Sequence, residues 1–135
     1  MPNFYKDKTF FILLCLPIPV WIYLYWTNGT ANIDDGIIIF LTFVVLYPAI
    51  EELVFRGFIQ RWVEGLVSRE LSIFTAANII TSTLFALLHL VNHPPALAAL
   101  TFFPSLIFGL AQDRYKTLAA PTILHCTYNA AYFSL

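Results

Sequence analysis

The stretch from Gly36 to Trp62 reads GIIIFLTFVVLYPAIEELVFRGFIQRW and joins a long apolar run to a charged one. Its first fifteen residues carry no charge, and they meet Glu51 and Glu52 without a turn-forming residue between them. A membrane span needs about 20 mostly apolar residues, so the expected helix continues through both carboxylates toward Trp62. Charged side chains inside a span are costly and mark functional candidates. The stretch therefore predicts a membrane helix that carries reactive groups.

The composition of the whole chain indicates a membrane protein. Of its 135 residues, 59% are hydrophobic and 11% are charged, whereas soluble domains are about 25% charged. Seven Lys/Arg and eight Asp/Glu give a net charge of −1, which leaves no basic surface for nucleic acid. The length fits a single membrane domain, residues 1–135. We expect an all-α, polytopic transmembrane helix bundle in a lipid bilayer, with no nucleic-acid partner.

Five segments are apolar enough to be candidate spans and together use most of the chain. They are residues 9–33, 36–62, 71–91, 96–111 and 118–135. The first has its apolar centre at residues 10–26, and a cleaved signal peptide is the alternative, although the run is longer than such peptides usually have. Lysine and arginine gather on the cytoplasmic side of membrane proteins. Five spans and a cytoplasmic N-terminus place all seven basic residues there, because the loops 27–35 and 92–95 contain none.

The first polar cluster lies on the second segment. Glu52 and Arg56 are four residues apart and share a helix face, whereas Glu51 lies about 100° around the helix from Glu52. Arg56 can therefore neutralise Glu52 and leave Glu51 in a different environment, which is how adjacent carboxylates take different roles. The alternative is a solvated ion pair at the end of a helix.

Two further clusters lie on the third and fifth segments. His89 follows Phe85 by one turn, so the ring of Phe85 could wall the site of His89. His125 and Asn129 are four residues apart, so their side chains point the same way. A histidine that ends a span and polar contacts between helices are the alternatives.

Two prolines precede polar clusters by a few residues. Each removes one backbone hydrogen bond from its helix and bends it. On α-helical spacing, Pro48 frees the carbonyl of Val44 and Pro121 frees that of Thr117.

A carboxylate, two imidazoles and an amide on three spans can together activate a water molecule. Imidazole and amide N–H groups can then hold the developing oxyanion. Peptide-bond hydrolysis inside a membrane needs these groups.

Three motifs, in this order, resemble those of the CPBP family, which contains the type II CAAX prenyl proteases and related bacteriocin-processing and self-immunity membrane proteins. The motifs are Glu51-Glu52-x-x-x-Arg56, Phe85-x-x-x-His89 and His125-x-x-x-Asn129. The resemblance covers residues 46–130 as a CPBP-like catalytic core and leaves an extra N-terminal span, residues 9–26, outside it.

The resemblance implies a glutamic-type intramembrane endopeptidase that needs no cofactor. Its catalytic residues would be Glu51 as the base, His89 at the water, and His125 with Asn129 at the oxyanion. Its supporting residues would be Glu52, Arg56 and Phe85. A zinc site of Glu51, His89 and His125 with an open fourth position is the alternative. Zinc-bound histidines usually have hydrogen-bonded outer partners, and the sequence identifies none, so the metal-free mechanism is preferred.

The chain is short for this family, whose CAAX proteases have about eight spans. The resemblance therefore implies a reduced substrate-binding surface and a membrane-associated protein or peptide substrate, such as one with a C-terminal sorting tail, in a bacterial cytoplasmic membrane. A catalytically silent binding or bacteriocin-immunity protein on the same scaffold is the first alternative, and an ion-coupled carrier is the second. A cysteine protease using Cys126 is disfavoured, because adjacent residues on a helix do not face each other.

The depth of His89 poses a geometric problem. It follows Arg69 by twenty residues, or about 30 Å on a straight helix, which would place it too far from Glu51. The polar stretch 60–70 favours helices that extend beyond the membrane, so that Arg69 is a poor marker of depth.

Overall fold

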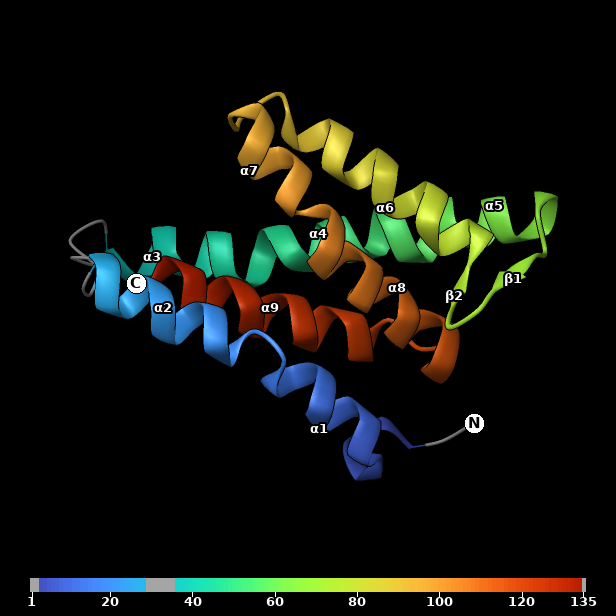
Figure 1. Ribbon diagram of the computed structural model, residues 1–135, viewed down its shortest axis with the longest axis horizontal. Coiled ribbons are helices and arrows are strands. Elements are labelled where there is room, and N and C mark those ends of the chain that lie inside the picture. Colours follow the sequence, from blue (N-terminus) through green and yellow to red (C-terminus); the bar gives the residue numbers. More distant parts are fainter. Residues whose placement is uncertain (1–2, 29–35, 135) are drawn as a thin grey trace.

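The computed structural model describes residues 3–28 and 36–134, and most of them are helical (Figure 1). The helices are α1 Lys8–Cys15, α2 Ile18–Asn28, α3 Gly36–Leu41, α4 Tyr47–Glu52, α5 Arg61–Leu66, α6 Ala76–His89, α7 Pro95–Leu100, α8 Phe102–Tyr115 and α9 Ala119–Phe133. A short 3₁₀ turn, Phe4–Lys6, precedes α1. The predicted all-α class is confirmed.

One long helix carries the stretch that decides the fold. Two π-helical stretches, Thr42–Leu46 and Leu53–Gln60, join α3, α4 and α5 into a continuous helix over Gly36–Leu66, 31 residues long. The prediction that the second segment continues past Glu51 and Glu52 is therefore confirmed. Such i→i+5 turns are rare and often occur at functional sites.

Three helices among the described residues are long and apolar enough to cross a membrane, namely Lys8–Thr27, Gly36–Leu66 and Pro95–Tyr115. The two other predicted spans correspond to α6 and α9, which have 14 and 15 residues and pack against α8. Figure 1 shows the N-terminal end, the β1–β2 hairpin and the α8–α9 turn toward one end of the bundle, and the α6–α7 turn toward the other. The count of five spans and the cytoplasmic N-terminus remain predictions, and most of the predicted loop 27–35 lies outside the described residues.

The third predicted segment begins later than expected. Glu70–Leu71 (β1) pairs antiparallel with Phe74–Thr75 (β2), and Ser72 takes a left-handed backbone conformation in the turn between them. The hydroxyl of Thr75 then accepts a hydrogen bond from the Asn78 backbone N–H at 3.0 Å and caps α6. Helix formation therefore starts at Ala76 and not at the predicted residue 71. The 14 residues of α6 span about 21 Å. The hairpin therefore makes the distance from Arg69 to His89 shorter than the about 30 Å of a straight helix.

The two prolines lie in different helical settings. Just before Pro48 the helix is π-helical, and the Tyr47 N–H donates to the Thr42 carbonyl. Continuing this i→i+5 spacing puts Pro48 opposite the carbonyl of Phe43, and the freeing of the Val44 carbonyl stays a prediction. Pro121 lies in the first turn of α9, where backbone N–H groups have no helical acceptor, so it neither bends the helix nor frees a carbonyl within it.

The helix α1 packs on α8 and α9. Phe10 and Leu13 of α1 join a buried cluster with residues of α8 and α9. Asp7, just before α1, forms an ion pair with Arg114 near the end of α8 at 2.8 Å. The Thr9 backbone N–H and the Arg114 guanidinium both hold the pKa of Asp7 below its usual range. The helix α1 is thus a packed part of the bundle.

Candidate functional site

Glu52 and Arg56 form a fully buried ion pair in the middle of the long helix. The Arg56 Nε donates to Glu52 Oε2 at 3.2 Å, and neither side chain is exposed. The i,i+4 spacing places both on the face that packs against other helices. Arg56 therefore neutralises Glu52, as the spacing predicts.

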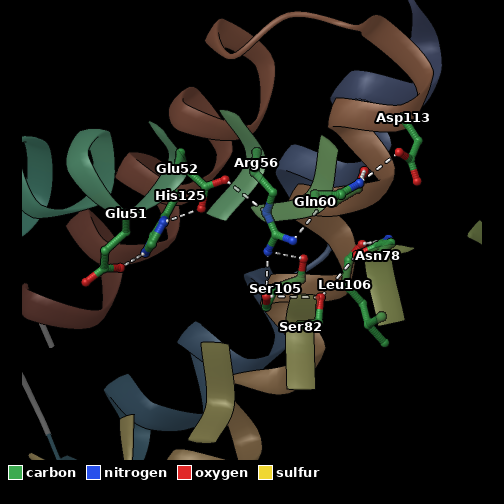
Figure 2. A network of polar contacts seen from close by, with 11 residues as sticks. Glu51, Glu52, Arg56, Gln60, Asn78, Ser82, Ser105, Leu106, Asp113 and His125 are labelled. Atoms are coloured by element: carbon green, nitrogen blue, oxygen red, sulfur yellow. Dashed lines mark hydrogen bonds and ion pairs between the residues drawn. The ribbon is translucent and has the colours of Figure 1, made fainter. Parts of the chain in front are cut away.

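Arg56 uses its remaining N–H groups on neighbours that the sequence analysis missed. One Nη donates to Gln60 Oε1 at 3.0 Å, and the other donates to the Ser105 carbonyl at 2.8 Å and to the Ser105 hydroxyl. Gln60 in turn donates to Asp113 at 2.8 Å, and Asp113 also accepts from Thr75 at 2.8 Å. Figure 2 shows this network running from Glu51 to Asp113 through the interior.

A side branch of the same network ties α6 to α8. The Ser105 hydroxyl donates to Ser82, Ser82 donates to Asn78 Oδ1, and the Asn78 amide donates to the Leu106 carbonyl at 2.9 Å. Gly109 makes room for Asn78, because a Cβ at this glycine would lie 1.9 Å from the Asn78 Oδ1. We call Glu52, Arg56, Gln60, Ser105, Ser82 and Asn78 the closed network.

His125 joins the closed network to Glu51. Its Nδ1 lies 2.8 Å from Glu52 Oε1, and its Nε2 lies 3.6 Å from Glu51 Oε2. A carboxylate can only accept a hydrogen bond, so Nδ1 carries a proton and Nε2 faces Glu51. The 3.6 Å separation is too long for a hydrogen bond. The imidazole is therefore oriented by one carboxylate and presented to the other.

Glu51 is the more accessible of the two carboxylates. Its side chain is 31% exposed, against 0% for Glu52. Because Arg56 is bound to Glu52, Gln60 and Ser105, the ion pair of Glu51 among the described residues is with His125. The two adjacent glutamates thus have the separate environments that their helical positions predict.

His89 lies beside this group on α6. Its Nδ1 is 2.9 Å from the Phe85 carbonyl, which can only accept, so Nδ1 donates. Its Nε2 has no hydrogen-bond partner among the described residues. The buried ring of Phe85 contacts both imidazoles, with centroids 4.4 Å from His89 and 5.9 Å from His125. His93, in the turn after α6, stacks on His89 at 5.7 Å. Phe85 therefore stands where the sequence places it, as a wall of the histidine site.

Asn129 has a different neighbour from the one expected. Its amide donates at 3.0 Å to the carbonyl of Phe43, which lies five residues before Pro48. Among the described residues no hydrogen bond joins Asn129 to His125 or Glu51. The contact fixes α9 against the long helix, one turn beyond His125.

The zinc alternative agrees with the outer hydrogen-bond partners of the two histidines but not with the grouping of the proposed ligands. Both imidazoles have the outer partners that the sequence could not identify, Glu52 for His125 and the Phe85 carbonyl for His89. That the sequence identifies no outer partners is therefore no argument against zinc. Within residues 3–28 and 36–134, however, no three His, Cys, Asp or Glu side chains are grouped closely enough to hold a metal ion.

The missed polar residues follow a pattern that the sequence does contain. Glu52, Arg56 and Gln60 recur every four residues on the long helix, and Asn78 with Ser82 repeats this spacing on α6. A stripe of polar residues at i, i+4 and i+8 inside an apolar helix indicates a buried polar face. Only the packing of the helices shows that these stripes face one another.

The family comparison agrees with this geometry. A family model, described as type II CAAX prenyl endopeptidase Rce1-like, matches residues 33–131. The match covers most of the 135 residues and includes both glutamates and both histidines of the site, while α1 and α2 lie outside it. No curated protein and no solved structure matches the chain. The chain belongs to the Rce1-like family of type II CAAX prenyl endopeptidases.

Proposed function

We propose that this protein is an intramembrane endopeptidase in which Glu51 activates a water molecule to cleave a membrane-associated protein or peptide. The family is a protease family, and the apolar helices indicate an integral membrane protein. The observation that carries the proposed mechanism is the contact of His125 with both glutamates, of which Glu51 alone is accessible.

In the proposed reaction, Glu51 takes a proton from water as the water oxygen attacks the scissile carbonyl carbon. The free Nε2 of His89 accepts a hydrogen bond from this water and orients it. The carbonyl oxygen becomes an oxyanion, which a protonated Nε2 of His125 stabilises by donating to it. Glu52 holds His125 in the required orientation. The proton on Glu51 then passes to the leaving amine as the C–N bond breaks.

Asn129 has two amide hydrogens, of which one is donated to Phe43. The other is the proposed second donor to the oxyanion. Its bond to Phe43 supports this role by fixing the amide relative to the long helix.

No cofactor takes part in the proposed mechanism. This choice is supported by the lack, among the described residues, of a group of three such side chains that could hold a metal ion. The proposed substrate class is a protein or peptide with a membrane-associated C-terminal tail, in a bacterial cytoplasmic membrane.

The test is a cleavage assay in membranes with co-expressed reporters, one set ending in a CAAX tail and another in a transmembrane C-terminal sorting tail. We expect Glu51→Gln and His125→Ala to abolish cleavage at matched expression, with a chelator having no effect. Glu64→Gln is the matched control, because Glu64 is exposed and pairs with Lys116 at the surface, and it should cleave like wild type.

Several outcomes would change the proposal. Activity that survives Glu51→Gln would end the glutamate mechanism, and chelator sensitivity reversed by zinc would favour the metal site. A Glu51→Gln variant that keeps the cellular phenotype of the wild type would favour a catalytically silent scaffold.

A further inference from the structure

We infer that Tyr128 is a positioning residue of the active site, which fixes the ring of His125 by tying Phe108 to the first membrane span. This inference rests on the proposed catalytic role of His125. It also gives α1 and α2 a role in holding Tyr128, although both helices lie outside the residues that the family model matches.

The hydroxyl of Tyr128 donates to the Leu13 carbonyl at 2.6 Å. On α-helical spacing the partner of this carbonyl would be residue 17, but Pro17 has no backbone N–H. An orphan carbonyl in an apolar environment strongly favours any available donor. The interruption of the helix between α1 and α2 thus provides the carbonyl to which Tyr128 donates its hydrogen bond.

Asn129, the next residue on α9, makes a similar contact with the long helix. Asn129 donates to the Phe43 carbonyl, whose π-helical partner would be Pro48. Two consecutive side chains therefore fasten α9 to two different helices, at carbonyls that lie four and five residues before a proline. Both bonds lie within one turn of His125, so both fix the position of that turn.

The ring of Tyr128 connects this anchor to the imidazole. Its centroid lies 5.3 Å from Phe108 in an edge-to-face contact and 6.1 Å from Trp21 of α2. Phe108 is 1% exposed and stacks on His125, with centroids 4.6 Å apart and ring planes 19° apart. Phe85 contacts the imidazole ring at an interplanar angle of 67°.

The contacts of His125 with Glu52, Phe108 and Phe85 leave its imidazole ring little freedom to rotate or tilt. Glu52 fixes the Nδ1 end of the ring, and the two phenylalanines restrict its tilt, so Nε2 stays toward Glu51. Catalytic groups must be held within roughly 0.5 Å of the productive geometry. Loosening Phe108 through Tyr128 should therefore lower the rate of the chemical step more than it weakens substrate binding.

The test compares Tyr128→Phe with Tyr132→Phe in the full chain, purified in detergent. Tyr132 is one turn further along α9 and is 53% exposed. Tyr132→Phe also removes one hydroxyl and is therefore the matched control. With a tail reporter that the wild type cleaves, we expect Tyr128→Phe to lower kcat about threefold to tenfold, the worth of one hydrogen bond, with KM unchanged. Tyr132→Phe should match wild type in both.

A second readout does not depend on cleavage. Stacking on Phe108 shifts the ring protons of His125 upfield in NMR spectra, and Tyr128→Phe should reduce this shift while Tyr132→Phe leaves it unchanged. Phe108→Leu should lower kcat as well, and the double variant should fall no further than Phe108→Leu alone, because both act through one contact.

Unchanged kcat and unchanged His125 resonances in Tyr128→Phe would overturn the inference, as would an equal loss in Tyr132→Phe. Glu51→Gln in the same preparation separates the two proposals. If Glu51→Gln is inactive and Tyr128→Phe behaves like wild type, only the positioning role fails. If Glu51→Gln cleaves, the proposed catalytic function fails.

Discussion

Glu51 and Glu52 are neighbours in the chain, yet they belong to two regions with opposite properties. Glu52 lies in the closed network, where it is fully buried and bound by Arg56 and His125. Glu51 lies in the open part of the site, partly exposed, with His125 beyond hydrogen-bonding distance. The difference teaches that the buried region holds charge in place, while the open region leaves a carboxylate accessible.

Removing the charge of Arg56 should have the largest effect on the closed network. Arg56→Met leaves Glu52 buried without its cation, and breaking a buried pair in this way costs about 3–5 kcal/mol. We expect a large drop in the thermal unfolding midpoint in detergent, whereas Glu51→Gln should leave it near that of wild type. The double variant Glu52→Leu/Arg56→Met should recover much of the loss. An Arg56→Met protein as stable as wild type would contradict the comparison.

The far end of the closed network should be sensitive to a single methyl group. Gly109→Ala places a Cβ 1.9 Å from the Asn78 Oδ1, so Asn78 must move and lose its bonds to Ser82 and Leu106. Overpacking of this kind costs about 1–3 kcal/mol. Gly65→Ala is the matched control, because a Cβ there has nothing within 4 Å. Equal unfolding midpoints for the two variants would show that the network tolerates displacement at this end.

The smallest expected effect concerns Asp7, at the surface and away from both regions. Its pKa is lowered in the folded protein, so its interactions with Thr9 and Arg114 stabilise the fold above the ordinary aspartate pKa of about 3.9. This contribution is lost as the pH falls through the lowered folded pKa. We expect Asp7→Asn to be slightly less stable than wild type at pH 7 and equally stable at the acid end of a pH series of unfolding midpoints. A constant difference across the series would contradict this assignment.

Several features follow from local sequence and could be predicted from it. The uncharged runs predict apolar helices, and the i,i+4 spacing of Glu52 and Arg56 predicts their ion pair, because both depend on helix geometry alone. The hairpin at residues 70–75 could not be predicted in this way. Its strands have two residues each, and the apolar residues around them fit a continuing helix equally well.

The sequence by itself therefore determines the class of protein, the long helix through Glu51 and the division between the two glutamates. Only the tertiary structure decides which groups meet across helices. It places His125 between the two glutamates, Ser105 and Gln60 around Arg56, and Asn129 on a carbonyl of the long helix. The physical reason is that periodicity fixes which residues share a face of one helix, whereas helix packing fixes which faces meet.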